Sequence, residues 1–236
     1  GSQNGPIRDY HFDVSGPLVH ELQYAFMRDW HFITAEPAET LLTEDFFPEP
    51  VRAGDQTARL ISTGPVAGSE IPVETYFSAI TLACKQIIVV TPYFVPPPEI
   101  LRALLSAALR GVDVQLVVPK NNNHFYAGLA SRALYEELLL AGVKIYERRP
   151  PFMHAKALLI DDECALIGTA NLDNRSLNLN YESTVAVYSE PFVDRMKEIV
   201  FEDLEFSDPV DRAVWQQRPA VRRLLENLAS LMNPVL

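Results

Sequence analysis

The side chains in this sequence most suited to chemistry are a histidine and a lysine two positions apart, His154 and Lys156. They stand at the start of two apolar runs separated by the acidic turn Asp161-Asp162-Glu163, a pattern that predicts a β-hairpin. Because side chains along a strand alternate between faces, we expect the imidazole and the ammonium group to project side by side. A histidine so placed can attack phosphorus or transfer a proton to a leaving oxygen. The pair therefore predicts phosphoryl-transfer chemistry.

Three residues further along the chain are candidates to complete such a site. Thr169 can present a hydroxyl group, and Asn171 an amide donor, to the nonbridging oxygens of a phosphoryl group. Glu182 is the best candidate to accept a hydrogen bond from the second ring nitrogen of His154 and so to fix its tautomer. With the lysine, these residues would make a reactive histidine, a carboxylate that orients it and a charge clamp.

These residues resemble the signature of the phospholipase D superfamily, which is written H-x-K-x4-D followed by G-[ST]-x-N. Asp161 completes the first motif, and residues 168–171 form the second. Further segments are similar to bacterial cardiolipin synthases, namely residues 91–96, 110–114, 140–146, 171–182 and 234–236. The resemblance covers nearly the whole chain. It implies the C-terminal half of such an enzyme, carrying the second of its two motifs.

The resemblance implies a reaction and a set of roles. The reaction is phosphatidyl transfer between two phosphatidylglycerols through a phosphohistidine, giving cardiolipin and glycerol, without a metal or other cofactor. Asp161 would have a mainly structural, supporting role at its turn. Thr169, Tyr93 and Arg175 are expected to contact the substrate, and Tyr93 leaves a central strand at its C-terminal end, where α/β folds bind ligands.

Relatives of this kind carry two motifs, whose histidines meet in one active site between two repeats. This chain has one, since none of its other histidines has a lysine two positions later. Residues 9–17 and the helical pattern after them resemble the stretch that follows the first motif. We therefore expect a fragment that supplies half of an active site, is inactive unless it dimerises, and pairs with the first repeat of its parent protein or with a second copy. By analogy, His154 would be the general acid and base.

Composition limits the partners of the chain. Its 20 basic and 31 acidic residues give a formal net charge of −11, which opposes long-range attraction both to nucleic acid and to an anionic membrane surface. No window approaches the 18 or so continuous apolar residues of a membrane span, so we expect a soluble fragment of a parent protein at the bacterial cell membrane. The expected partners are an anionic phospholipid substrate and, through the parent protein, the membrane surface. Two cysteines, Cys84 and Cys164, lack metal-ligand spacing.

The order of apolar patterns predicts an α/β fold, a layered mixed β-sheet with helices on both faces. We divide the chain into residues 1–54, the tail of a first repeat and a linker, and residues 55–236, a second phospholipase D-like domain. Strands are expected near 58–62, 86–91, 113–118, 143–147 and 182–187, and helices at 73–84, 98–110 and 125–140 and from residues 191 and 218. The last helix is amphipathic with arginines near its start, and we expect it to dock on the core rather than on a membrane.

Some residues and functions keep two interpretations. His124 opens a predicted helix, which favours a capping role over contact with substrate. Arg148 and Arg149 are either ligands of a lipid phosphate or a solvated surface pair. The alternative functions are a phospholipase D or nuclease of the same fold, which transfers the phosphoryl group to water, and a catalytically silent domain that binds lipids or protein partners.

Overall fold

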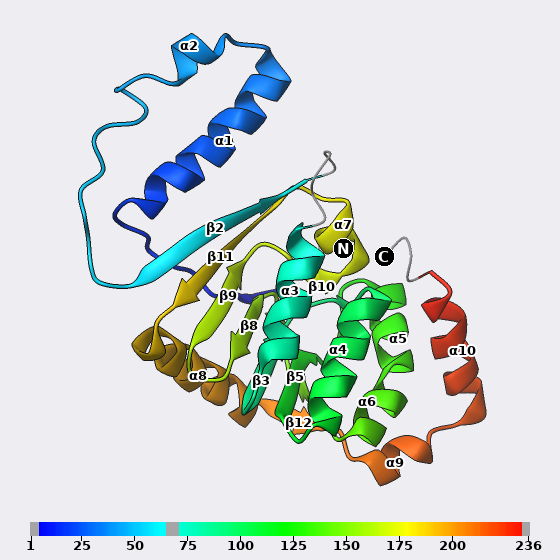
Figure 1. Cartoon of the computed structure of the whole chain (residues 1–236). Coiled ribbons are helices and arrows are strands. Elements are labelled where there is room, and N and C mark those ends of the chain that lie inside the picture. Colours follow the sequence, from blue (N-terminus) through cyan, green and yellow to red (C-terminus); the bar gives the residue numbers. More distant parts are fainter. Residues whose placement is uncertain (1–4, 65–70, 233–236) are drawn as a thin grey trace.

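The centre of the structure, a computed structural model that describes residues 5–64 and 71–232, is a mixed β-sheet (Figure 1). Its strands are β2 (Thr57–Thr63), β3 (Gln86–Val90), β5 (Asp113–Pro119), β6 (Lys144–Arg148), β8 (Ala157–Ile160), β9 (Cys164–Gly168), β11 (Glu182–Tyr188) and β12 (Ser207–Pro209). They lie in the order β12-β6-β5-β3-β8-β9-β11-β2. The strands β3, β5 and β6 are parallel, and the other neighbours are antiparallel. The similar segment at residues 234–236 lies outside the described residues.

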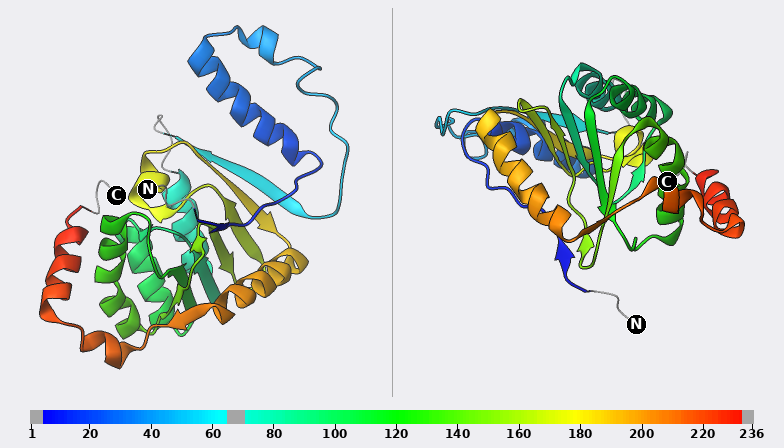
Figure 2. Two further views of the ribbon diagram at one scale, coloured as in Figure 1. Left: turned by 180° about the vertical axis from the view of Figure 1, so that it is seen from behind. Right: turned by 90° about the horizontal axis from the view of Figure 1, so that it is seen from below.

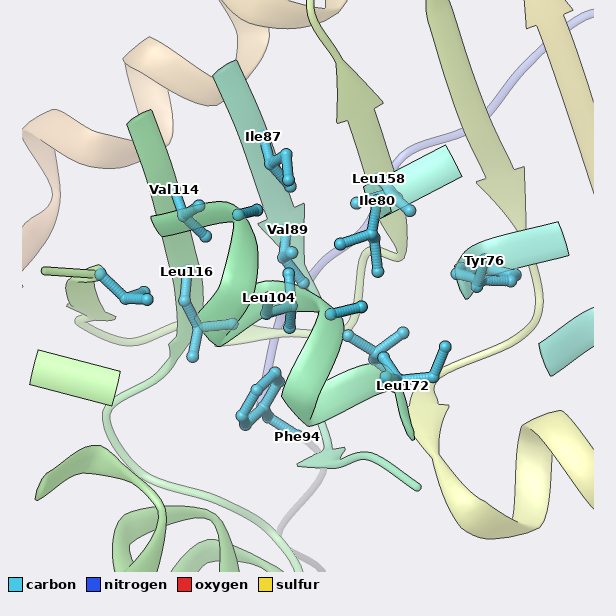
Figure 3. Packing of buried hydrophobic residues seen from close by; sticks show 14 of the residues in the cluster. Tyr76, Ile80, Ile87, Val89, Phe94, Leu104, Val114, Leu116, Leu158 and Leu172 are labelled. Atoms are coloured by element: carbon cyan, nitrogen blue, oxygen red, sulfur yellow. The ribbon is translucent and has the colours of Figure 1, made fainter. Parts of the chain in front are cut away.

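Helices cover both faces of this sheet (Figure 2). One face carries α3 (Ile71–Leu82), α4 (Pro98–Leu109) and α6 (Tyr135–Ala141), and the other carries α8 (Glu190–Glu205). Strand β3 is buried on both sides: Ile87 and Val89 pack in the α3 and α4 cluster (Figure 3). Ile88 and Val90 pack on the opposite face with α8. A strand sandwiched in this way reads as a continuous apolar run. The predicted layered α/β fold with helices on both faces is confirmed.

Two short parallel pairs lie outside the eight-stranded sheet. Strand β1 (Ile7–Arg8) pairs with β7 (Phe152–Met153), directly before His154. Strand β4 (Phe94–Val95) pairs with β10 (Leu172–Asp173), directly after Asn171. These pairs bring the N-terminal segment and the turn after β3 to the residues with predicted chemistry.

The predicted helix at 125–140 is two helices, α5 (Phe125–Ala133) and α6, with Leu134 between them. At this break Tyr135 enters the core, and its ring lies 4.9 Å from that of Trp215 between ring centroids. Trp215 belongs to α9 (Arg212–Gln216), a short helix that the sequence pattern did not predict. The predicted single helix was therefore wrong, because a distant contact decides where the turn falls.

The N-terminal helices α1 (Leu18–Thr34) and α2 (Ala38–Leu41) lie beyond the β2 edge of the sheet (Figure 1). Glu21 accepts a hydrogen bond from the backbone N–H of Leu60 at 2.7 Å, and Arg28 donates to the Ser62 hydroxyl at 2.9 Å. The C-terminal helix α10 (Ala220–Ser230) packs against α5. Across residues 5–64 and 71–232, no helix combines the length and apolarity needed to cross a bilayer.

Candidate active site

His154 and Lys156 lie side by side, as their spacing predicts. They do not lie in a hairpin strand, because the ladder of β8 begins only at Ala157. The backbone nevertheless keeps the strand alternation, since Met153, Ala155 and Ala157 are all buried in the cluster under α8. The two polar side chains therefore share the opposite side. The ammonium nitrogen of Lys156 lies 2.8 Å from Nδ1 and 3.0 Å from Nε2 of His154.

The carboxylate that contacts the imidazole of His154 belongs to Asp9. Its Oδ2 lies 3.1 Å from Nδ1 of His154, whose side chain is 40% exposed. The pairing of β1 with β7 makes this contact possible: the His154 N–H donates to the Arg8 carbonyl at 2.8 Å, which places Asp9 beside the ring. A proton on Nδ1 would be donated to Asp9, and Nε2 would then accept from Lys156. One neutral tautomer thus satisfies both neighbours.

A buried ion cluster holds the Asp9 segment in place. Asp203 on α8 accepts from Nε of Arg148 at 2.9 Å, from Nε of Arg8 at 3.1 Å and from the Tyr10 hydroxyl at 2.8 Å. Burial and the adjacent Asp203 carboxylate raise the pKa of Tyr10, so this hydroxyl remains a donor. Arg148 is buried here, which differs from both interpretations of it, as a lipid ligand or as a solvated surface residue. The cluster binds residues flanking Asp9 to the core.

Glu182, the predicted partner of His154, makes a different contact. Its Oε1 accepts a hydrogen bond from the side-chain amide of Asn180 at 3.3 Å, and in the described part of the chain it makes no hydrogen bond with His154. It still acts on the site through its charge. Burial lowers the pKa of Lys156, whereas the negative charges of Asp9, Glu182 and Asp173 oppose that shift. The lysine therefore lies among three carboxylates.

Asn171 and Thr169 are placed differently from each other. The Asn171 amide nitrogen donates to the Ser176 hydroxyl at 3.2 Å, and its buried oxygen has no hydrogen-bond partner among the described residues. The Thr169 hydroxyl accepts a hydrogen bond from the Ser183 backbone N–H at 2.9 Å, so one of its hydrogen bonds is made with β11. Thr169 also lines a cavity of about 790 Å³ between β9, β11 and the N-terminal segment, and His154 is not among the residues lining that cavity.

Asp161 stands at the turn after β8 with a positive φ of 51°. Its carboxylate accepts from the backbone N–H groups of Cys84 at 2.9 Å, Lys85 at 2.7 Å and Gln86 at 2.8 Å. Burial favours the protonated carboxyl, but these three donors outweigh it and hold the pKa of Asp161 below its ordinary value. This residue joins the turn to the start of β3.

Tyr93 forms one wall beside His154. The two ring centroids are 6.4 Å apart in an edge-to-face arrangement, and the Tyr93 hydroxyl donates to Asn123 at 2.8 Å. His124 packs on the same tyrosine with centroids 5.4 Å apart. His124 is the N-cap residue of α5, as its place before the helix predicts, but its side chain makes no capping hydrogen bond and its ring packs toward the site. Arg175 lies exposed on α7 (Asn174–Asn178), the short helix after β10.

A known protein family matches the part of the chain that contains these site residues. Residues 76–204, more than half of the chain, match the family model described as "Cardiolipin synthase, PLD-like domain", and they include His154, Lys156, Asn171 and Glu182. The chain belongs to this PLD-like domain family. Within the described residues of this PLD-like chain, no group of three or more histidine, cysteine, aspartate or glutamate side chains is arranged to hold a metal ion.

Several curated relatives of this PLD-like chain are cardiolipin synthases. The chain is 40% identical over 231 residues to "Cardiolipin synthase" of Geobacillus thermodenitrificans, covering 97% of this chain and 45% of that protein. It is 32% identical over 223 residues to "Cardiolipin synthase A" of Proteus mirabilis, covering 94% and 46%. The chain therefore spans about half the length of the curated relatives that it matches.

Solved structures agree on the fold. A phospholipase D family member, Nuc from Salmonella typhimurium, matches with a TM-score of 0.56 and 20% identity, over 66% of this chain and 99% of that one. A phosphatidylserine synthase from Haemophilus influenzae matches with a TM-score of 0.62 and 15% identity, over 80% and 50%. At these identities the matches establish the phospholipase D-like fold and nothing finer.

The sequence analysis of this PLD-like chain did not identify Asp9. A weak internal repeat could have done so, since residues 14–19 read V-S-G-P-L-V and residues 188–193 read Y-S-E-P-F-V. Both stretches lead into a helix, α1 and α8. An acidic residue stands shortly before each: Asp9 before the first and Glu182 before the second. Aligning the two stretches places Asp9 opposite Ser183, one position after Glu182, so the two carboxylates fall near the same point of the repeat.

Proposed function

We propose that this PLD-like chain supplies one half of the active site of a cardiolipin-forming phosphatidyltransferase. The proposal rests above all on the contact of His154 with both Lys156 and Asp9, inside a domain of this family. The substrate would be phosphatidylglycerol, and the products cardiolipin and glycerol. The 40% identity to cardiolipin synthases over 97% of the chain supports this choice over other phosphodiester substrates.

In the first step of the proposed reaction, a nucleophilic histidine attacks the phosphorus of one phosphatidylglycerol, and the bond from phosphorus to the headgroup glycerol oxygen breaks. Protonated His154 gives its Nε2 proton to that oxygen, and glycerol leaves. In the second step His154 takes a proton from the hydroxyl group of a second phosphatidylglycerol. That oxygen then attacks the phosphohistidine and releases cardiolipin. Asp9 accepts from Nδ1 in both protonation states and keeps the ring in position.

Lys156 and Asn171 would bind the phosphoryl oxygens. Without substrate, the ammonium group of Lys156 lies on the nitrogen that transfers protons, so it must turn toward the substrate's oxygens during reaction. For Asn171, the reversed amide orientation lets the Ser176 hydroxyl donate to its oxygen and leaves an N–H free in the buried position. Both groups then stabilise charge on phosphorus. Tyr93, Thr169 and Arg175 remain proposed substrate contacts, and Glu182 and Asp161 supporting residues.

The nucleophilic histidine would come from a partner half. We propose residues 1–54 as the tail of a first repeat, and either that repeat or a second copy of this chain as the partner half. The coverage of only 45% of the Geobacillus protein is in keeping with a partner half of similar size. The anionic substrate implies work at a bacterial membrane surface, and the net charge of −11 argues against nucleic acid as an alternative substrate.

The test measures products from labelled phosphatidylglycerol vesicles. The chain is assayed over a range of concentrations, alone and as part of a longer polypeptide that includes the upstream repeat, each with a His154→Ala control. We expect cardiolipin and glycerol in equal amounts from the longer polypeptide, and from the chain alone only where it dimerises.

Three outcomes would contradict the proposal. Phosphatidic acid as the only product would indicate a hydrolytic phospholipase D, and cleavage of added DNA would indicate a nuclease. Unchanged activity in the His154→Ala protein would favour a catalytically silent domain.

A further inference from the structure

The C-terminal helix α10 docks with its apolar side outward. Its outer face consists of six residues that are between 44% and 75% exposed, namely Val221, Leu224, Leu225, Leu228, Leu231 and Met232. The inner side buries Glu226 completely and Ala229 nearly so. The helix therefore lies against the domain, as its pattern led us to expect, but through a carboxylate and a small residue rather than through its leucines.

Ion pairs fix this orientation. Glu226 accepts from Nε of Arg218 at 2.9 Å and from Nε of Arg222 at 3.2 Å, and Arg218 also donates to Glu136 on α6 at 3.2 Å. Ala229 packs against Val95 and Ala130. Turning the helix so that its leucines faced the domain would separate a fully buried carboxylate from its two guanidinium partners, which costs several kcal/mol. The outward leucines are thus a stable property of the fold.

The surroundings of this face carry the opposite charge to the rest of the protein. Residues 211–232 contain four arginines and two carboxylates, a local charge of +2 in a chain whose formal charge is −11. Arg222 and Arg223 are about half exposed, and each pairs with a carboxylate, Arg222 with Glu226 and Arg223 with Glu136 on α6. A leucine face bordered by arginines is the composition of helices that lie in the interfacial layer of an anionic bilayer. Two copies facing each other would instead bring like charges together.

The outer face also lies close to the active site. Ala229 contacts Val95, which is two residues from Tyr93, the neighbour of His154. The C-terminal end of α10 lies at the same end of the molecule as α7 (Figures 1 and 2). At that end the first residues of α5, Phe125 and Tyr126, are 68% and 61% exposed. A bilayer that meets the outer face would therefore lie near the exposed side of His154.

We propose that the outer face of α10 docks on an anionic lipid bilayer and presents the active site to it. This inference rests on the proposed function, because a membrane is where phosphatidylglycerol is found. It adds a binding surface, formed by α10, that is separate from the catalytic residues.

The test is flotation of the intact chain with vesicles of phosphatidylglycerol and phosphatidylcholine, compared with phosphatidylcholine alone. We expect binding that is stronger on the anionic vesicles and weakened about tenfold or more by the double substitution Leu224→Ser and Leu228→Ser, since apolar burial and charge act together. The matched control is Leu82→Ser with Leu109→Ser, two leucines that are each 75% exposed on α3 and α4. This control should bind as the unsubstituted chain does.

A second measurement tests the inference if the double variant Leu224→Ser and Leu228→Ser fails to fold. Tryptophan at position 228, in Leu228→Trp, should be quenched by brominated lipids, whereas tryptophan at position 109, in Leu109→Trp, should not. Absence of binding by the unsubstituted chain, equal binding by both double variants, or equal quenching at the two positions overturns the inference. So does a dimer in solution that the Leu224→Ser and Leu228→Ser variant converts to a monomer, because the face would then be an interface between copies.

Binding is measured without turnover, so the two proposals can fail separately. Vesicle binding through α10 without cardiolipin formation would leave this inference standing and count against the proposed function. Cardiolipin formation together with vesicle binding that is unchanged by the outer-face substitutions would support the proposed function and count against this inference.

Discussion

At the scale of single residues, the contact between Asp9 and His154 sets how the imidazole can act. A histidine that both gives and takes a proton on Nε2 needs its Nδ1–H held in the same direction throughout. The carboxylate of Asp9 provides an acceptor 3.1 Å away, while Glu182 lies in the same charged environment and bonds Asn180. The two acidic residues therefore have different expected effects when they are changed.

Asp9→Asn should lower kcat about 100-fold or more with little change in KM, because the amide can present an N–H to the ring and disfavour the working tautomer. Steady-state kinetics in the polypeptide containing both halves would measure this. Asp13→Asn, at an exposed position in the same segment, is the control and should leave kcat unchanged. A normal kcat in Asp9→Asn, together with a large loss in Glu182→Gln, would return the orienting role to Glu182.

The depressed pKa of Lys156 predicts the alkaline side of the pH profile. Burial disfavours the ammonium form, so the lysine loses its charge at a lower pH than the ordinary value of 10.5. Activity should fall as pH rises through that depressed pKa, because a neutral amine no longer attracts phosphoryl oxygens. The arginine in Lys156→Arg keeps its charge in this pH range. The activity of this variant should therefore be lower overall but should not fall as pH rises through the pKa of the lysine. A parallel alkaline fall in both proteins would assign the titration to another group.

The site residues that the sequence could predict are those that are close in the chain. The adjacency of His154 and Lys156 follows from backbone alternation and needs no tertiary information. Asp9 is 145 positions away from His154, and its approach depends on the pairing of β1 with β7. Neither strand has more than two residues, too few to leave a periodic pattern.

At the scale of secondary-structure elements, the Asp203 cluster links α8 to the segment that carries Asp9. Its carboxylate is 2% exposed and binds Arg8, Tyr10 and Arg148 together. Removing the carboxylate charge leaves the buried guanidinium of Arg148, and the partly exposed one of Arg8, without its counter-charge. The cost should appear both in stability and in the site.

Asp203→Asn should reduce the free energy of unfolding by about 3 kcal/mol or more. It should also lower activity, because the Asp9 segment loses its anchor. Denaturant unfolding monitored by circular dichroism measures the first effect. The control is Asp208→Asn, which removes a surface pair with Lys120 and should cost under about 1 kcal/mol. Equal losses in the two variants would show that the cluster contributes no more than a surface ion pair.

The elements that the sequence predicted well are those with strong periodic patterns. The helix expected at 98–110 is α4, Pro98–Leu109, and the strand expected at 86–91 is β3, Gln86–Val90. The break at Leu134 escaped prediction because local propensity favours one continuous helix there. Packing of Tyr135 on a helix far along the chain overrides that propensity. The outward face of α10 escaped for a similar reason: the pair of Arg222 and Glu226 is local, but the burial of Glu226 and the contact of Arg218 with Glu136, 82 positions away, depend on the tertiary fold.

At the scale of the whole molecule, a half site makes activity depend on assembly. If two copies pair, each complete site contains His154 from both. At a fixed total protein concentration, an equal mixture of the unsubstituted chain and the His154→Ala chain should then have about a quarter of the activity of the unsubstituted chain, rather than about half, since mixed dimers are inactive. Product formation after re-equilibration measures this. A loss in proportion to the fraction of variant would show that the copies do not exchange or act separately, and retention of about three quarters of the activity would show that one histidine suffices in a shared site.

The order of strands in the sheet has a practical consequence for anyone who trims this protein for expression. A piece cut to residues 76–204 discards β2, which covers the outer edge of β11. The bared backbone groups of β11 would invite pairing between molecules, so such a piece should precipitate or form fibres. It would also lack Asp9 and all of α10. The smallest useful expression fragment therefore begins at the extreme N-terminal strand and runs through the last helix.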